Sequence, residues 1–321
     1  LYETRASSKG LGAFAINDIK RGQRILAESP LLSIPHAPFF NEDIEAAFEK
    51  LSPEDKEKYF KLHSAHGQNP ADWPINIHPS VLPLERKRIE EQHAARIGEK
   101  ATVGSIFITN CMEMGKGAGI FYDCARFNHS CSSNAYFSWN VRIGKETIHA
   151  IKDIKAGEEI TLCYCDPHHD VRLRQWELKH YGFVCDCPAC GDASDSGSFA
   201  ALSAQRRYRL LELNDKSSPF RYRNLESAVG NPQAVKNLLE MAALQRAEGL
   251  WTAELANSYM DIALICEARD DYRHALNAAQ LSLQVTVDCR GSDCEDIPKC
   301  LDVIQRLKRK IEEAKAKAKK V

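Results

Sequence analysis

The chain has 321 residues, of which 44% are apolar, and a formal net charge of −1 with a pI of about 6.9. This length allows one large and one smaller core, and the near-neutral charge excludes a global field that would attract nucleic acid or an anionic membrane. Twelve cysteines, no N-terminal apolar signal segment and no apolar run of about 20 residues predict a soluble intracellular protein with reduced thiols, nuclear or cytoplasmic.

The first 35 residues predict short strands. Residues 12–16 alternate small and large side chains, residues 18–22 form a turn, and residues 23–32 are a β-compatible run that ends before Pro35. Gly10 and Gly12 are one residue apart, which lets the backbone approach a ligand closely, although this spacing by itself favours a plain turn.

Residues 36 to 100 form a polar, mainly helical insertion between strands. Apolar residues recur at helical intervals over 42–51, 53–63 and 84–97, and Ser52-Pro53 is a helix start signal. The histidines of this insertion are expected at the surface rather than as ligands. Residues 101–114 are apolar and compatible with either a buried helix or a strand, and residues 115–119 predict a hairpin loop.

The segment from residue 139 to residue 164 predicts further strands. Residues 139–151 form two strands around Gly144, and residues 154–164 form a turn and a strand. Polar and metal-binding candidates border these strands, since Arg-Phe-Asn-His-Ser-Cys precedes them at 126–131.

Three thiols lie within six residues at Cys185, Cys187 and Cys190. They cannot all pair with one another as disulfides, because neighbouring cysteines on so short a loop lack the required geometry. A shared metal fits better. A closed structural zinc site takes four ligands, so this triplet needs one more ligand from elsewhere in the chain.

The C-terminal third predicts a separate helical domain. Residues 192–198 form a linker, and amphipathic helices are expected at 233–248, 252–268, 272–287 and 297–317. The segment 270–276 resembles the helix-turn-helix junction of tetratricopeptide-like repeats. The basic end, 306–320, predicts a solvated helix face because Glu312 and Glu313 interrupt it.

Several ordered motifs resemble one known family. Asn128-His129-Ser130-Cys131, Gly-Glu-Glu-x-x-x-x-Tyr ending at Tyr164, and Cys-x-Cys-x-x-Cys at 185–190 are similar to the SET domain and post-SET motif of protein lysine methyltransferases. The run from His180 to Cys187 is closest to the SET and MYND branch. Residues 36–110 contain no cysteine, so the MYND zinc module of that branch is absent.

This resemblance implies an α+β fold in two parts. The first is a SET-domain β-fold over residues 1–190, with a helical insertion at 36–100 and a zinc-binding post-SET motif at 180–191. The second is an all-α, tetratricopeptide-like domain over residues 200–321, which would cover one side of the substrate groove.

The resemblance also implies S-adenosylmethionine as cofactor. The expected cofactor-binding residues come from the N-terminal loop, from the Asn-His motif and from single positions elsewhere. They are Lys9, Gly10, Leu11, Gly12, Asn110, Asn128, His129 and Phe183.

Tyr164 is the expected catalytic residue. Lysine titrates near pH 10.4, so an aromatic channel and the adjacent sulfonium must favour the neutral amine, while the phenol aligns it. Tyr181 and Phe183 share one face of an extended segment and are expected to wall this channel. The alternatives are a strand-end core tyrosine at 164 and core packing at 181 and 183.

The same resemblance implies Cys131 as the fourth zinc ligand, beside Cys185, Cys187 and Cys190. The competing candidates for the fourth position are Cys163, Cys165, His168 and His169. Four thiolates on one metal would hold the aromatic wall rigid.

The expected function is therefore S-adenosylmethionine-dependent methylation of protein lysines, in histones or other proteins, by a monomer with no sequence-specific nucleic-acid partner and no membrane. One alternative is a non-catalytic or repurposed SET fold that binds partners or takes a non-protein substrate. A zinc-stabilised adaptor without a cofactor site is the other.

Overall fold

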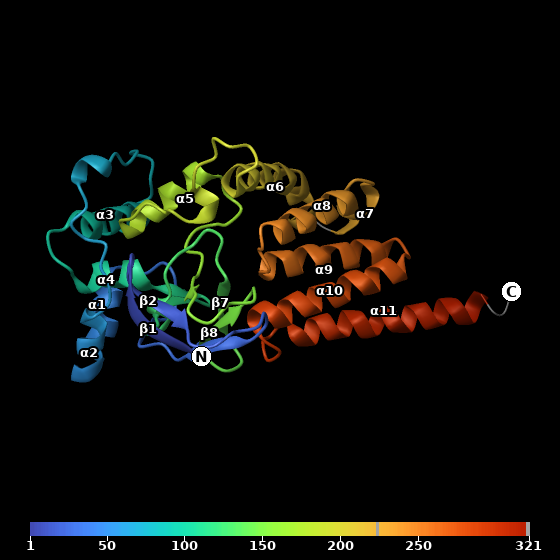
Figure 1. The fold of residues 1–321 in the computed structure, drawn as a ribbon, viewed down its shortest axis with the longest axis horizontal. Coiled ribbons are helices and arrows are strands. Elements are labelled where there is room, and N and C mark those ends of the chain that lie inside the picture. The colour runs from blue at the N-terminus through green and yellow to red at the C-terminus, as the bar shows by residue number, and fades with distance from the viewer. Residues whose placement is uncertain (223–224, 319–321) are drawn as a thin grey trace.

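The computed structural model describes residues 1–222 and 225–318. Figure 1 shows the strands and the helical insertion at one end of an elongated molecule, and the C-terminal helices at the other end. The predicted division into a strand-rich part and a helical part is present.

Three antiparallel sheets of three strands each form the first part. Their cores are filled by alternating apolar side chains, such as Ile148 and Ile160, both fully buried. The strand orders are β1 (Tyr2–Ser7), β2 (Gly10–Ala15), β9 (Glu159–Ile160); β3 (Arg24–Glu28), β8 (Lys145–Ala150), β7 (Ala135–Asn140); and β4 (Leu32–Ile34), β6 (Gly117–Ile120), β5 (Met112–Met114).

The insertion contains the three predicted helices. The start signal at Ser52 is confirmed, because its hydroxyl accepts a hydrogen bond of 3.1 Å from the Asp55 N–H at the N-terminus of the second helix. Ile44 of the first helix and Tyr59 of the second pack into one core with the β4–β6 sheet. The helices are α1 (Asn41–Glu49), α2 (Pro53–Phe60) and α3 (Pro83–Ile97).

The ambiguous stretch 101–114 is mostly helix. Thr102 caps α4 (Val103–Asn110), and β5 follows directly. The loop predicted at 115–119 is wrong beyond residue 116, since residues 117–120 form strand β6. A Cβ atom on Gly117 would lie 1.8 Å from the carbonyl oxygen of Ile34, so only glycine lets these two strands pair. The strand expected over 154–164 is reduced to β9.

The C-terminal part is entirely helical over its described residues outside the connections. The four predicted helices are confirmed, and α8, α9, α10 and α11 stack in sequence order (Figure 1). None of the described helices is both long and apolar enough to cross a membrane. The helices are α6 (Phe199–Tyr222), α7 (Leu225–Gly230), α8 (Ala234–Ala247), α9 (Ala253–Ala268), α10 (Tyr272–Arg290) and α11 (Ile297–Ala318). Helix α5 (Val171–Leu178) precedes them and belongs to the first part.

The two parts share an interface along β7 and β8. Tyr136 of β7 packs into the core of the helical part. Arg21 pairs with Asp288 of α10 at 3.0 Å, and Arg24 pairs with Asp293 just beyond it. Apolar contacts and ion pairs therefore both hold the C-terminal helices against the β3–β8–β7 sheet.

Candidate active site

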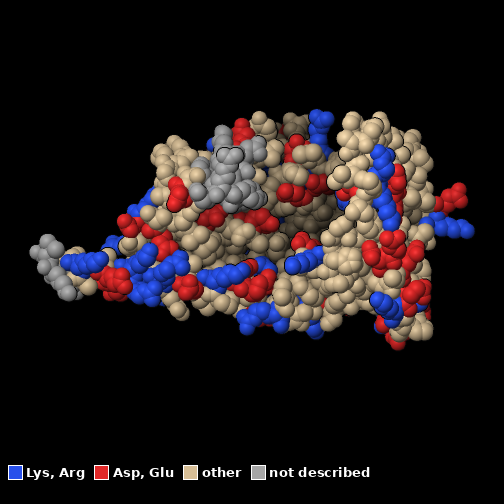
Figure 2. Space-filling model, turned by 180° about the vertical axis from the view of Figure 1, so that it is seen from behind, with Lys and Arg blue, Asp and Glu red and all other residues tan. Residues whose placement is uncertain are grey.

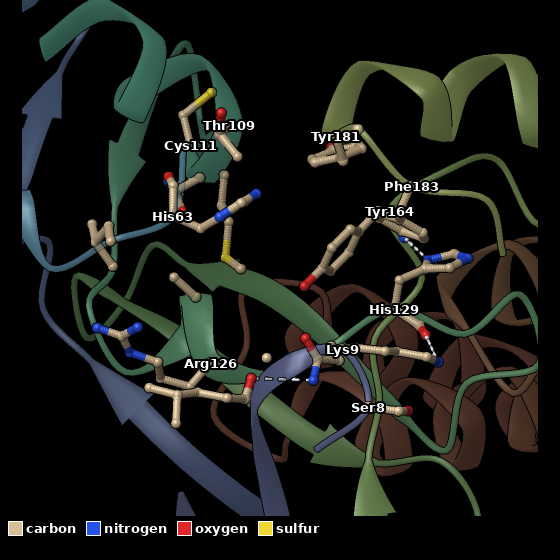
Figure 3. Close-up of a pocket in the computed structure, with 18 of the residues that line it drawn as sticks. Ser8, Lys9, His63, Thr109, Cys111, Arg126, His129, Tyr164, Tyr181 and Phe183 are labelled. Carbon is tan, nitrogen blue, oxygen red and sulfur yellow. Dashed lines mark hydrogen bonds between the residues drawn. The ribbon is translucent and has the colours of Figure 1, made fainter. Parts of the chain in front are cut away.

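A cavity of about 710 Å³ opens between the β1–β2 turn, the segment after α2, the end of α4 and the segment after α5. Figure 3 shows Lys9, His129, Tyr164, Tyr181 and Phe183 around it, with Arg126 and His63 on the opposite side. A volume of this size holds a ligand of drug or cofactor size. The lining residues are Ser8, Lys9, Gly10, Leu11, Lys61, Leu62, His63, Thr109, Asn110, Cys111, Met112, Ala125, Arg126, Asn128, His129, Phe137, Tyr164, Tyr181, Gly182, Phe183, Val184 and Asp186.

The β1–β2 hairpin forms one wall because two glycines permit its shape. Gly10 has a φ of +95°, which a side chain would strain. A Cβ atom on Gly12 would lie 2.3 Å from Oε1 of Glu159 and 2.9 Å from Nδ2 of Asn128. Gly12 does not line the cavity. Because it has no side chain, the amide of Asn128 can lie against the hairpin.

Lys9 and Asn128 tie the hairpin to the Asn-His turn. The Lys9 ammonium donates a hydrogen bond of 3.1 Å to the carbonyl of His129 and lies 3.6 Å from the Asp186 carboxylate. The Asn128 amide donates to the carbonyl of Leu11 at 3.1 Å and to Glu159 at 2.8 Å. These bonds fix a cationic group at the edge of the cavity.

Tyr164 is held at both ends. Its backbone N–H donates to Nδ1 of His129 at 3.0 Å, and its hydroxyl donates to the carbonyl of Phe127 at 2.5 Å. Because that bond uses the only phenolic hydrogen, the oxygen keeps lone pairs for another partner. Burial raises the pKa of Tyr164 well above its usual value, so the phenol stays neutral. Figure 3 shows its ring projecting into the cavity.

Aromatic rings surround Tyr164. The ring centroids of Tyr164 and Tyr181 are 5.0 Å apart, and those of Tyr181 and Phe183 are 6.4 Å apart. Burial raises the pKa of Tyr181 to about 12. Tyr164, Tyr181 and Phe183 therefore form one aromatic cluster. The environment beside these rings favours uncharged groups.

A second cavity, of about 470 Å³, lies on the other side of this aromatic cluster. Tyr164, Tyr181 and Cys111 line both cavities and form the wall between them. The other lining residues of the second cavity are Phe39, Gln92, Arg96, Ile108, Cys165, Asp166, Glu177 and His180.

On the face seen in Figure 2, the surface is also hollowed between the two parts of the molecule, and acidic side chains gather around the hollow.

The four predicted thiols lie together. The sulfur atoms of Cys131, Cys185, Cys187 and Cys190 are all within 4.8 Å of one another. Three of these residues are buried and Cys190 is partly buried. Cys165 belongs to a separate group with His129 and Cys131, and Cys163, His168 and His169 belong to neither group among the described residues. This donor set and its compactness fit a tetrahedral zinc site.

Two buried arginines hold the thiol cluster from outside. Arg174 of α5 donates to the carbonyl of Ala189 at 3.1 Å and to the sulfur of Cys190 at 3.4 Å. Arg207 of α6 donates to the carbonyl of Cys131 at 2.9 Å and pairs with Glu248 at 3.1 Å. A guanidinium beside thiolates offsets part of their negative charge, and outer contacts of this kind orient metal ligands.

Most of the residues predicted to bind the cofactor lie in the wall of the first cavity. Seven of the eight residues expected to bind the cofactor line the first cavity, and the exception is Gly12. The amide nitrogen of Asn110 donates to the carbonyls of His63 and Ile106, each at 2.7 Å, so this side chain also fixes the wall.

Several lining residues from the insertion and its borders were not predicted from the sequence, among them His63, Thr109 and Arg126. His63 is exposed, as expected, but it also lines the open cavity. Asp186, between Cys185 and Cys187, and Val184, directly before Cys185, also line the cavity, and their position beside the thiols could have revealed them.

Comparisons with known proteins agree with this architecture. Residues 10–165 match the family described as SET domain. The chain is 26% identical over 291 residues to "Histone-lysine N-methyltransferase set5" of Schizosaccharomyces pombe, covering 90% of this chain and 78% of that protein. It is 34% identical over 136 residues to "Histone-lysine N-methyltransferase SET5" of Meyerozyma guilliermondii, covering 40% of this chain but only 26% of that protein.

A solved structure, described as "Structure of Rubisco LSMT bound to AdoMet", aligns with 96% of this chain and 87% of its own, at 14% identity and a TM-score of 0.39. That likeness is too distant to carry an argument about this chain. The family match covers strand β2, the Asn-His motif and Tyr164. The chain therefore contains a SET domain, and the candidate active site is built largely from it.

Proposed function

We propose that the protein is an S-adenosylmethionine-dependent protein-lysine N-methyltransferase. The observation that carries this proposal is the position of Tyr164 in the wall shared by the two cavities. A methyl donor in the first cavity and a lysine side chain entering from the second would meet at this phenol. The names of the two yeast relatives support the same reaction.

The first cavity has the chemistry to hold the cofactor. Lys9 offers a cation for a carboxylate, and its present partner, Asp186, is mostly exposed and therefore held weakly. Leu11 and Val184 line the same cavity while 51% and 83% exposed, so an aromatic base could cover them. Gly10, Asn110, Asn128, His129 and Phe183 would complete the binding surface.

The aromatic wall would prepare the acceptor amine. Lysine normally titrates near pH 10.4, and an environment of Tyr164, Tyr181 and Phe183 disfavours its charged form. The free lone pairs of the Tyr164 hydroxyl would accept hydrogen bonds from the amine and weak C–H···O contacts from the methyl group. When bound, S-adenosylmethionine supplies an electron-poor methyl group.

We also propose that Cys131, Cys185, Cys187 and Cys190 bind one structural zinc ion. The ion would connect the Asn-His turn to the segment that carries Tyr181 and Phe183. It would have a mechanical role and no part in the transfer.

The resemblance also supports proposals about the branch of the family, the type of helical domain and the class of substrate. The motif from His180 to Cys187 supports a relationship to the SET and MYND branch, and the stacked α8–α11 helices support a tetratricopeptide-like domain. The relatives' names support histones among the substrates, and hence action in the nucleus. Acidic side chains around the hollow of Figure 2 suit a lysine-rich partner.

The test is to incubate the full chain with labelled S-adenosylmethionine and histones or cell lysate. We expect transfer of label to protein lysines, and a loss of at least 100-fold in Tyr164→Phe with cofactor binding retained. Tyr208→Phe is the matched control, because Tyr208 is exposed on α6. Cofactor binding without transfer to any protein would favour the repurposed SET fold, and the absence of a thermal shift with the cofactor would favour the adaptor.

A further inference from the structure

The second cavity contains a cation that lacks an anionic partner. Arg96 of α3 is half-buried, and no carboxylate among the described residues lies within ion-pairing distance of its guanidinium. Its Nε is buried without a hydrogen-bond partner. Burial accordingly lowers the pKa of Arg96, with only a small opposing effect from Tyr181. A half-buried charge without a counter-ion is less favourable than a paired one, and a ligand carboxylate in this cavity would supply the counter-charge.

The surroundings of Arg96 hold it in place for such a ligand. Its guanidinium lies 4.9 Å from the ring centre of Trp73, which is itself fixed by a hydrogen bond of 2.6 Å to Gln68. His180 lies 5.0 Å from the same ring, and its Nδ1 is also buried without a partner. Arg96 and His180 both line the second cavity, so the guanidinium and the imidazole border the same space.

The acidic groups of the second cavity already have partners. Asp166 accepts hydrogen bonds from the backbone and ring of His168, at 2.8 and 3.0 Å. Glu177 accepts from the Asp166 N–H at 2.9 Å and from the ring of His169 at 2.6 Å. Both carboxylates of this cavity are therefore already hydrogen-bonded, whereas the Arg96 guanidinium has no carboxylate partner among the described residues.

We propose that Arg96, with His180, forms a subsite for an acidic side chain of the protein substrate, close in sequence to the lysine that is methylated. The proposal rests on the proposed function, since it takes the second cavity as the entrance for that lysine. Arg96 and Tyr164 line one cavity of about 470 Å³. An extended chain advances about 7 Å in two residues, so the acidic residue would lie within about three positions of the lysine.

This assignment gives the insertion a part in substrate choice. Arg96 and Gln92 come from α3, whereas Tyr164 and His180 come from the SET domain and the segment after α5. Figure 1 shows α3 beside α5. A substrate segment in this cavity would contact both the insertion and the SET domain. A substrate with an amide in place of the carboxylate would leave Arg96 unpaired in the complex.

The experiment uses the full chain and peptides with one central lysine, in which each position from −3 to +3 is Asp, Asn or Lys in turn. Methylation is measured as kcat and KM, and peptide affinity is measured separately by fluorescence anisotropy with S-adenosylhomocysteine present. We expect Asp at one or two positions to improve affinity and KM at least tenfold over Asn, with little change in kcat.

Variants at position 96 decide the assignment. Arg96→Gln should abolish the preference for Asp, Arg96→Lys should retain part of it, and Arg96→Glu should favour Lys. Arg88→Gln on the same helix is the control for net charge, because Arg88 forms an exposed pair with Glu85. Thermal melting and cofactor affinity should match the unmodified chain in all variants.

Two results would overturn the subsite: equal affinity for Asp and Asn peptides at every position, or an unchanged Asp preference in Arg96→Gln. The anisotropy measurement keeps this question separate from catalysis. If no peptide is methylated but Arg96→Gln removes a preference in binding, the methyltransferase proposal fails and the anion subsite stands.

Discussion

The backbone N–H of Tyr164 donates a hydrogen bond of 3.0 Å to the imidazole of His129, whose other nitrogen lies 3.2 Å from the sulfur of Cys131. Since Nδ1 accepts, Nε2 carries the hydrogen and points toward the thiol. Burial lowers the pKa of His129 to about 4, which keeps the ring neutral at physiological pH. One side chain thus connects the candidate catalytic residue to the candidate metal site.

The first prediction concerns this connection. In His129→Phe the ring volume remains but the acceptor is lost, so the Tyr164 backbone should shift and kcat should fall by roughly 10- to 100-fold. His274→Phe, at an exposed position on α10, should leave kcat unchanged. The measurement is steady-state methyl transfer beside the Kd for the cofactor. An unchanged kcat in His129→Phe would show that the bond does not position Tyr164.

Gly12 supplies a second prediction. A methyl group at this position would clash with Glu159 and Asn128, which hold the β1–β2 hairpin against the Asn-His turn. Gly12→Ala should therefore weaken cofactor binding about tenfold or more, measured by titration calorimetry. Gly230→Ala is the control, because a Cβ atom there meets nothing within 4 Å. Equal affinities in the two variants would mean that the hairpin tolerates displacement.

The identity of the metal ligands can be tested by elemental analysis. Cys131→Ser and Cys187→Ser should lose most bound zinc and melt at a lower temperature, because a three-ligand site holds zinc weakly. Cys165→Ser should keep its zinc. Retention in Cys131→Ser together with loss in Cys165→Ser would transfer the fourth position to Cys165.

Arg207 gives a prediction about stability. Its guanidinium is fully buried between the carbonyl of Cys131 and the carboxylate of Glu248. Arg207→Met would leave the Glu248 charge with Arg206 as its remaining cation and should lower the free energy of unfolding by about 3 kcal/mol. Arg209→Met, which breaks exposed pairs, should cost much less stability, because exposed ion pairs contribute little. Denaturant unfolding with and without zinc measures both.

Glu146 predicts a dependence of stability on pH. Both of its carboxylate oxygens are buried without partners, and burial raises its pKa from 4.5 to about 8, with Glu113 and Glu28 adding to the effect. The folded state therefore binds more protons than the unfolded state between these values, so stability contributed by the protonated group is lost as pH rises from about 4.5 to about 8.

Glu146→Gln removes this titration. Relative to the unmodified chain, the variant should gain stability as pH rises across this window, with a difference of order 4 kcal/mol between its two ends. Melting temperatures at pH 5, 7 and 8.5 would reveal it. Parallel curves for the two proteins would show that Glu146 keeps its ordinary pKa in the folded state.

The sequence predicted the residues whose chemistry is local. Cys185, Cys187 and Cys190 share one short segment, and Asn128 and Tyr164 belong to ordered motifs, so all of them were identifiable before the fold was known. The insertion helices were likewise identifiable from periodicity and from the cap at Ser52.

Other residues of the site carry no such signal. Arg96, His63 and Thr109 come from different elements, and only the packing of α3 and α4 beside the aromatic cluster brings them to the cavities. Helix α5 was missed although Asp170 caps it, because its eight residues lack a clear apolar face. The strand at Gly117 required knowledge of its partner, since only the approach of Ile34 explains the glycine.

The bond from Arg207 to Cys131 has a consequence for the unity of the chain. The composition changes near residue 195, yet α6 reaches back across that point to support the turn that carries Asn128 and His129. A fragment ending at residue 198 would lose this support and the contacts of α10 with β7 and β8. The helices beyond the linker thus support the cavity, and the SET domain depends on them for its shape.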